Sequence, residues 1–403
     1  MAKEALAGVK VADFSWNAVG PIMGSYMAKH GATVVKVESI HRLDSMRTSP
    51  PFLGGNTDPD RTGAFPWLNS GKYGITLDLR QPRAVAVARQ LADWADVLLE
   101  SFTPGTMKKW GLSYLEVRET NPEVVYFSTC NQGQTGPNAS QPGFGTQLTA
   151  LSGITHVTGW PDRGPSFPFA AHTDFVSMRF GFATIIAALA YRERTGKGQY
   201  LDLSQHEASL HLQAPSILDY EISGRVAGRM GNRSPSAAPQ GAYRCRGDDG
   251  WCALSVGSDE EWGSFRRAMG EPAWSRELRF ATGTGRKDNE DELDVLVSQW
   301  TLEFPAAEAA EALHRAGVSA GVVQSGRDIH SDPQLKARGF FESLEHPTLG
   351  SHVYHHAPFH LSRTPEVLRR GHCLGEHTEY VLTQLLGMSD DEFTGLLQEG
   401  ALD

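Results

Sequence analysis

The sequence predicts an α/β protein with a large, doubly wound, Rossmann-like parallel-sheet domain and an inserted, smaller α+β domain. Short β-rich runs alternate with helical stretches in the first half of the chain, beginning with residues 9–14, a helix that Pro21 opens, and residues 34–38. A strand, a helix and a strand within about 30 residues are typical of a βαβ unit, and repetition of this order predicts a parallel sheet. The 403 residues exceed the ~150 of a common domain, which agrees with a second domain.

The same order continues along the chain. A proline opens the helix predicted over residues 82–95, and a buried strand is predicted over 96–100. Ser113 and Glu116 form an S-x-x-E capping box, which predicts the start of a helix before the next strand at 123–129.

The most hydrophobic helix is predicted over residues 174–192, before a strand over 199–203. Its apolar residues face all sides of the helix, so we expect it to lie in the interior. Its longest uninterrupted apolar stretch, 182–190, is shorter than the ~20 residues of a membrane-spanning helix. We therefore expect no membrane partner.

Composition divides the chain into a large and a small domain. Residues 1–224 form the first part of the large domain, and residues 225–246, rich in Arg, Gly, Ser and Pro, are predicted to be a linker. Residues 247–330 form the predicted α+β domain. Residues 331–403 are expected to return, as a second linker and the C-terminal part of the large domain.

Charge and cysteine usage favour a cytoplasmic protein that binds no nucleic acid. Acidic residues outnumber basic ones by 47 to 37, so the net charge is −10, whereas a nucleic-acid binder presents a basic surface. The four cysteines form no CxxC pair, which is typical of reduced thiols in the cytoplasm. The start of the chain lacks the apolar segment of a secretory signal.

Common nucleotide and nucleophile motifs are missing from the sequence. The first βα turn, SWNAVGP, has one glycine where dinucleotide-binding proteins have G-x-G-x-x-G, and neither a P-loop nor a G-x-S-x-G sequence is present. Cys130 at a strand end is a conceivable nucleophile, although a plain small residue is more common there. Histidines crowd residues 352–360 without a complete set of metal ligands, so we predict no metal site.

Asp174 is the candidate catalytic carboxylate. It follows the uncharged segment GPSFPFAAHT and stands at the start of the apolar helix, so an acid lies in an apolar setting. Two interpretations remain open at this point. Asp174 is either a helix N-cap, the more common role of such an aspartate, or a carboxylate nucleophile whose acyl intermediate is stabilised by oriented N–H groups.

Seven segments occur in the order and with the spacing of one known family. They are LAGVKVADFSWNAVGP, HGATVVKVE, LNSGKYGITLDLR, ADVLLESFTPG, NPEVVYFSTCNQGQTGP, LAYRERTGKGQYLDLS and LGEHTEYVLTQLLGMSDDE. In these segments, and over nearly its whole length, the chain resembles the class III CoA-transferases, the family of formyl-CoA transferase and carnitine CoA-transferase.

The resemblance implies an enzyme that moves CoA from an acyl-CoA donor, with succinyl-CoA expected, to a free carboxylic acid. It places the family's nucleophile on Asp174, which would form an acyl anhydride and then an aspartyl-CoA thioester. Exclusion of water protects such an anhydride from hydrolysis. CoA and acyl-CoA are substrates in this scheme, and no tightly bound cofactor is expected.

The resemblance also implies which positions contact CoA. They lie in the loop after the first strand, in the segments LDLR and SFTPG, in the helical turn that follows, and in the loop PGFG. They are Asn17, Ala18, Val19, Leu77, Arg80, Ser101, Phe102, Lys109, Gly143 and Phe144. Many family members have arginine at the position of Ser39 and asparagine at that of Ser101, which leaves the contacts at the adenine end open.

One segment of the sequence differs from formyl-CoA transferase and suggests which kind of acid receives CoA. The segment GRMGNRSPSAAPQGAY stands where that enzyme has a glycine-rich lid, and resembles the branch that acts on larger or dicarboxylic acids, such as succinyl-CoA:benzylsuccinate and mesaconate-type transferases. Trp160, Phe167, Phe169 and Phe175 would suit an aromatic acid, although core packing is the more common role of aromatic residues.

Two other functions follow from the same resemblance. The α-methylacyl-CoA racemases share the fold, but they need a histidine where this chain has Phe144, which accepts no proton. Some relatives are heteromers that pair an active chain with a paralogue lacking the aspartate, so this chain could be a subunit active only with such a partner. We expect an interlocked homodimer, in which each chain threads through the other, or a heteromer of this kind.

Overall fold

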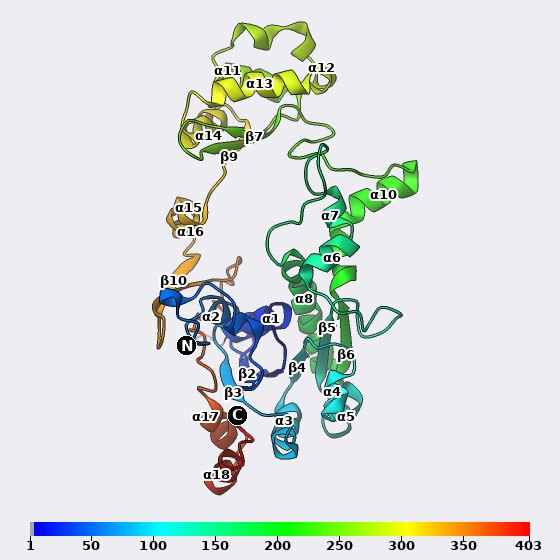
Figure 1. Ribbon diagram of the computed structural model, residues 1–403, viewed down its shortest axis with the longest axis vertical. Helices are drawn as coiled ribbons and strands as arrows, with labels where there is room; N and C mark the ends of the chain where they lie inside the picture. The colour runs from blue at the N-terminus through cyan, green and yellow to red at the C-terminus, as the bar shows by residue number, and fades with distance from the viewer. Residues whose placement is uncertain (1–3) are drawn as a thin grey trace. The chain divides into compact units, whose positions relative to one another are not determined.

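The computed structural model describes residues 4–403, which divide into two compact units (Figure 1). Unit 1 comprises the chain up to Thr155, Phe167–Val226 and Gln334–Asp403, and unit 2 comprises His156–Ser166 and Ala227–Pro333. Unit 2 thus contains two separate stretches of chain. They are joined by a backbone hydrogen bond from Gly231 N to Gly159 O (2.8 Å), and no sequence signal marks the first stretch as part of the smaller unit.

Unit 1 is built on a six-stranded parallel sheet, which confirms the predicted fold class. Its strands are β1 (Lys10–Asp13), β2 (Thr33–Glu38), β3 (Tyr73–Thr76), β4 (Val97–Glu100), β5 (Val125–Cys130) and β6 (Gln199–Ser204). The spatial order is β3-β2-β1-β4-β5-β6, and each neighbouring pair is parallel. In such sheets ligands bind at the carboxyl ends of the strands, where the order reverses, here between β1 and β4.

Helices pack on both faces of this sheet. The helices of unit 1 include α1 (Val19–Lys29), α3 (Pro82–Trp94) and α8 (His172–Thr195), which contribute to the cores on the two faces. The others are α2 (Ala64–Leu68), α4 (Thr106–Lys109), α5 (Tyr114–Thr120), α6 (Gly145–Leu151), α9 (Gln205–Leu210), α10 (Ala214–Ser223), α17 (Thr378–Tyr380) and α18 (Asp390–Gln398). Successive residues of a strand point to opposite faces. Accordingly, Ala12 and Leu98 pack with α3 in one core, and Val11 and Val97 pack with α1 and α8 in the other.

Helix α8 departs from the expectation of an interior helix. Its inner side fits closely against α1 and β5, because a Cβ at Gly181 would collide with Met23 and Phe127. Its outer side is exposed, with Phe180 and Tyr191 among the exposed residues. An apolar composition on all sides therefore does not mean burial within this chain, although the ring of Phe180 lies 4.8 Å from that of His211.

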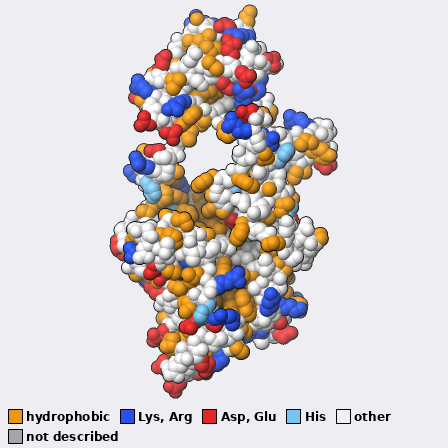
Figure 2. All heavy atoms as spheres, in the orientation of Figure 1, with side chains coloured by type: hydrophobic (Ala, Val, Ile, Leu, Met, Phe, Trp, Pro, Cys, Tyr) orange, Lys and Arg blue, Asp and Glu red, His pale blue; other side chains and the backbone are white. Residues whose placement is uncertain are grey.

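The same helix is long and apolar enough to cross a membrane by length and composition alone. Helices in the cores of globular proteins satisfy the same criterion. Met178, Ile185 and Ala188 of α8 are buried in the core that α8 and α1 form with the sheet. Helix α10 also has an exposed apolar side, where hydrophobic side chains are visible in Figure 2.

Unit 2 has its own core and an antiparallel sheet, as expected of an α+β domain. Its strands are β7 (Gln240–Arg244), β8 (Trp251–Ser255) and β9 (Ser319–Val322), in the order β7-β8-β9. Its helices are α11 (Asp259–Ala268), α12 (Gly283–Asp288), α13 (Glu290–Thr301), α14 (Ala306–Arg315) and α15 (Gly326–Ser331). The predicted linker 225–246 ends sooner than expected, because its last residues form β7 and pair with β8.

The histidine-rich region lies in unit 1, on and after an antiparallel hairpin of β10 (Phe341–His346) and β11 (Gly350–His355). His356 lies between two carboxylates, with Nδ1 and Nε2 each 2.9 Å from an oxygen of Glu366 and Glu342, respectively. Among residues 4–403, no group of three or more His, Cys, Asp or Glu is arranged to hold a metal ion. The short helices α7 (Ile154–Val157) and α16 (Pro333–Ala337) lie where the chain passes between the two units.

Candidate active site

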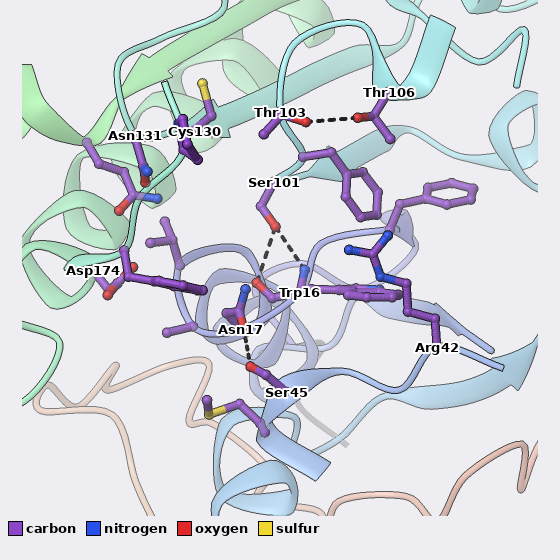
Figure 3. A pocket seen from close by; sticks show the side chains of 18 of the residues that line it. Trp16, Asn17, Arg42, Ser45, Ser101, Thr103, Thr106, Cys130, Asn131 and Asp174 are labelled. Carbon is purple, nitrogen blue, oxygen red and sulfur yellow. Dashed lines mark hydrogen bonds between the residues drawn. The ribbon is translucent and has the colours of Figure 1, made fainter. Parts of the chain in front are cut away.

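Unit 1 contains a cavity of about 1410 Å³ at the carboxyl ends of its strands. Its wall includes Phe14 after β1, Glu38 at the end of β2, Ser101 after β4 and Cys130 at the end of β5. The cavity brings together the predicted nucleophile and all of the predicted CoA-contacting residues, as far apart in the chain as Asn17 and Asp174 (Figure 3). These residues are Asn17, Ala18, Val19, Leu77, Arg80, Ser101, Phe102, Lys109, Gly143, Phe144 and Asp174.

Asp174 is the third residue of α8 and not its N-cap. The N-cap position is occupied by Ala171, which has no side chain able to cap the helix. The capping interpretation of Asp174 is therefore wrong, because the helix begins earlier than the sequence suggested. No basic residue within 4–403 forms an ion pair with the carboxylate, and burial raises the pKa of Asp174 to about 6. The ionised form is poorly solvated there, which increases the reactivity of a carboxylate nucleophile.

The chain approaches Asp174 closely at Gly145, the first residue of α6. A Cβ at this position would lie 3.1 Å from Asp174 Oδ2 and 3.1 Å from Thr173 Oγ1. Thr173 is fully buried, and its hydroxyl has no hydrogen-bond partner in the described part of the chain. Glycine at position 145 thus leaves the carboxylate and the neighbouring hydroxyl in place.

The N-terminus of α1 forms another part of the wall, through Ala18 and Val19. The preceding residue, Asn17, has a left-handed backbone (φ 65°), which is uncommon for a residue other than glycine. Its N–H donates to the buried carboxylate of Asp44 (3.2 Å), and its side chain accepts a hydrogen bond from Ser45. Ala18 provides no side-chain cap for α1. First-turn N–H groups of this kind attract anionic ligand groups.

Three aromatic residues, Trp16, Phe102 and Trp110, gather on a part of the cavity wall away from Asp174 (Figure 3). The ring of Trp16 is 5.7 Å from that of Phe102, which in turn is 5.6 Å from Trp110. Trp16 N donates to Ser101 Oγ (2.8 Å), so Ser101 holds the loop after β1 (Figure 3). The guanidinium of Arg42 lies 5.4 Å from the Trp16 ring. Planar rings beside a cation suit a purine with a nearby phosphate.

The cations of the cavity differ in their availability. Arg80 donates two hydrogen bonds to Asp78 (2.7 and 2.9 Å), so part of its guanidinium already has an acidic partner. Arg42 and Lys109 form no ion pair with residues 4–403. Arg42 was not predicted as a site residue. The sequence offered one signal for it: many relatives have an arginine at the position of Ser39, and Arg42 is an arginine three residues further along.

Some candidates considered from the sequence lie away from the site or are chemically unsuited. Phe167, Phe169 and Trp160 are absent from the cavity wall, whereas Phe175 belongs to it. Cys130 also lines the cavity, and burial raises the pKa of its thiol to about 11. Cys130 is thus protonated near neutral pH and a poor nucleophile.

Buried charges fix the loop between β2 and α2, which forms one side of the cavity. Arg47 donates to both oxygens of Glu38 (2.7 and 2.8 Å) and to Asp60 (2.6 Å). His372 Nε2 is 3.0 Å from Glu38, and these partners hold the pKa of the Glu38 carboxyl well below its usual range. This network ties the C-terminal segment to the end of β2.

A doubly wound parallel sheet with a large cavity at its carboxyl edge, and an unpaired carboxylate inside that cavity, defines an α/β enzyme that binds an extended ligand. Comparison with known families matches residues 6–378 to CoA-transferase family III. The chain belongs to this family and is a CoA-transferase, which confirms the resemblance. Enzymes of this kind use CoA thioesters as substrates.

Individual relatives agree with this assignment along nearly the whole chain. The chain is 33% identical over 392 residues to the succinyl-CoA–D-citramalate CoA-transferase of Chloroflexus aurantiacus, covering 97% of this chain and 96% of the relative. It is 31% identical to the succinate–glutarate CoA-transferase of Agrobacterium fabrum, with 95% and 96% covered. The crystal structure of a CAIB/BAIF family protein from Brucella suis superposes with a TM-score of 0.87 at 30% identity, covering 95% of this chain and 100% of that one.

Proposed function

We propose that this enzyme transfers CoA from succinyl-CoA to a free carboxylic acid with Asp174 as the covalent nucleophile. The observation that carries the proposal is the environment of Asp174, a carboxylate with a raised pKa and no ion pair among residues 4–403, in a cavity whose other end is aromatic and cationic. Two relatives whose names specify succinate or succinyl-CoA support the choice of donor.

The reaction proceeds by four exchanges at carbonyl carbons. A carboxylate oxygen of Asp174 attacks the thioester carbonyl, the C–S bond breaks, and CoA leaves as a thiolate. The thiolate attacks the aspartyl carbonyl of the resulting anhydride and releases the donor acid as its carboxylate. The second acid attacks the aspartyl-CoA thioester, and the thiolate then attacks the acyl carbonyl of the new anhydride. The product acyl-CoA forms, and Asp174 is regenerated as a carboxylate.

Trapping during turnover tests the covalent step. Hydroxylamine converts an aspartyl thioester into a hydroxamate, so peptide mass analysis after incubation with succinyl-CoA is expected to find this modification on Asp174. Asp174→Ala is expected to lack both the adduct and the transfer activity, because the variant has no carboxylate at this position. Full activity of Asp174→Ala would overturn the proposal. Loss of deuterium from α-labelled acyl-CoA without an acid acceptor would instead indicate a racemase.

The acceptor is proposed to be a dicarboxylic or aromatic acid, with benzylsuccinate as one compound to test. Phe144 and Phe175 give the cavity apolar surface beside its polar groups, and both named relatives act on dicarboxylic acids. A panel of acids offered with one CoA donor ranks these candidates directly.

We further propose that two copies of this chain associate through exposed apolar helix surfaces. Phe180 and Tyr191 of α8, together with Ile217, Leu218 and Ile222 of α10, are exposed within one chain, and exposed apolar patches commonly mark interfaces. Light scattering of the purified chain is expected to give the mass of an interlocked dimer, whereas the mass of one chain would contradict it. Activity that appears only after a paralogous chain is added would identify a heteromer.

A further inference from the structure

Two carboxamide side chains lie together at the carboxyl edge of the sheet, and neither belongs to the residues carried over from the family. Strands β5 and β6 pair in parallel up to Cys130 opposite Ser204. Asn131 and Gln205 follow this last pair on the two neighbouring strands. The next residue continues the link, because His206 N donates to Asn131 O (2.9 Å). Both Asn131 and Gln205 line the cavity that contains Asp174.

Gln205 is held rigidly by its backbone while its carboxamide is left without a partner. It is the first residue of α9, whose N-cap Ser204 accepts a hydrogen bond from Glu207 N. Ser209 Oγ donates to the Gln205 carbonyl (2.7 Å). The residue is 7% exposed, yet its carboxamide makes no hydrogen bond to residues 4–403. A carboxamide on a cavity wall that has no protein partner is free to form hydrogen bonds with a ligand.

Asn131 is placed close to the nucleophile by the glycine-rich loop. A Cβ at Gly143 would lie 3.1 Å from Asn131 Nδ2, and a Cβ at Gly145 would lie 3.1 Å from Asp174 Oδ2. The two side chains therefore contact the same short stretch of chain. Figure 3 shows Asn131 and Asp174 at one end of the cavity, with Arg42 at the opposite end.

A carboxamide offers two N–H donors and a carbonyl acceptor, and it carries no charge. It therefore forms hydrogen bonds with a hydroxyl, a carboxyl or a carboxylate oxygen, and it forms none with an alkyl chain. When Asp174 attacks the acyl carbonyl, the rest of the acid lies within the same end of the cavity. We propose that Asn131 and Gln205 select short acids with a second oxygen function, a hydroxyl or a second carboxyl group. This inference rests on the proposed function and specifies its substrate class.

Competition between acceptors tests the inference without interference from the donor. Equal concentrations of pentanoate, 3-hydroxypentanoate and glutarate are offered with one CoA donor, and the ratios of the acyl-CoA products are measured. The native enzyme is expected to favour at least one of the two oxygenated acids over pentanoate. Gln205→Met, which has similar length and no amide, is expected to reduce that preference about tenfold or more, because the oxygen loses its partner.

The matched control is Gln213→Met, because Gln213 is similarly buried (8% exposed) and absent from the cavity wall. It is expected to leave the product ratios unchanged. A smaller ratio for 3-hydroxypentanoate alone identifies a hydroxyl as the recognised group, and a smaller ratio for glutarate alone identifies a carboxyl group. If Gln205→Met fails to fold, Asn131→Ala is tested by the same ratios.

Three results would count against the proposals in distinguishable ways. A native enzyme that transfers CoA to all three acids equally overturns the inference and leaves the transferase function intact. A uniform fall in rate with unchanged product ratios in Gln205→Met assigns the residue a structural role and also overturns the inference. A native enzyme that transfers no CoA to any acid contradicts the proposed function itself.

Discussion

The two ends of the cavity differ in charge and in the way their side chains are held. At one end Asp174 lies near the neutral carboxamide of Asn131 (Figure 3), and burial raises its pKa to about 6. At the other end Trp16 and Phe102 are in edge contact, and Arg42 lies over Trp16 without an acidic partner among residues 4–403. The first arrangement suits a reactive carboxylate, and the second suits a polyanionic ligand with a planar base.

This difference indicates that binding and chemistry are assigned to separate parts of one cavity. Contacts at the aromatic end are made equally before and during the reaction, so they affect affinity more than turnover. Groups at the Asp174 end act on atoms whose bonding changes, so they affect turnover. Substitutions at each end therefore provide a direct test of the division.

The largest effect in this comparison is expected from Gly145→Ala. The added methyl group would lie 3.1 Å from Asp174 Oδ2 and from Thr173 Oγ1, so the nucleophile must shift. We expect kcat to fall about 100-fold, because small displacements of a reacting group are costly. The Kd for CoA, measured by calorimetry, is expected to change little. The control is Gly164→Ala, where a Cβ would meet no atom within 4 Å. A large rise in Kd with unchanged kcat would contradict the division.

A smaller effect, on binding alone, is expected from Arg42→Gln. Loss of the cation over Trp16 is expected to raise the KM for the CoA donor about fivefold at low salt, with kcat unchanged. The difference from the native enzyme should shrink as the salt concentration rises. Arg315→Gln serves as the control, because Arg315 is largely exposed on α14 of unit 2. An unchanged KM at low salt would mean that Arg42 does not contribute to binding of the CoA donor.

The parallel sheet could be predicted because it depends on local signals, whereas the site residues were predicted from the family resemblance. β-branched runs such as the one in β2 form strands, and loops at the carboxyl ends of parallel strands necessarily meet. Strand β3 was missed because it is short and contains Gly74, which weakens strand propensity. Family resemblance identified Asp174, whereas periodicity alone left helix capping as the more common explanation.

Features that depend on tertiary contacts could not be read from the sequence. The exposed side of α8 has the same apolar composition as its buried side, so only the folded chain distinguishes them. Arg42 and Gln205 face the cavity because of how their loops and strand ends are placed in space, and no local pattern marks either residue.

The smallest effect concerns stability, and it tests whether Asp174 is desolvated. Burial raises the pKa of Asp174 from 3.8 to about 6, so the folded state binds the proton more tightly than the unfolded chain. The contribution of Asp174 to the free energy of unfolding therefore falls as the pH rises through this range, and it stays low at pH 7. Asp174→Asn removes the ionisation and is expected to be more stable than the native enzyme at pH 7 by about 1 kcal/mol.

Urea denaturation at two pH values measures this difference. At pH 7 the midpoint of Asp174→Asn is expected above that of the native enzyme, and below about pH 3 the two midpoints should converge, because the native carboxyl is then protonated in both states. Asp248→Asn, at an exposed position in unit 2, controls for the loss of one surface charge. Equal stability of the native enzyme and Asp174→Asn at pH 7 would mean that water solvates the carboxylate fully. The two ends of the cavity would then differ only in the aromatic and cationic groups at the end that contains Trp16 and Arg42.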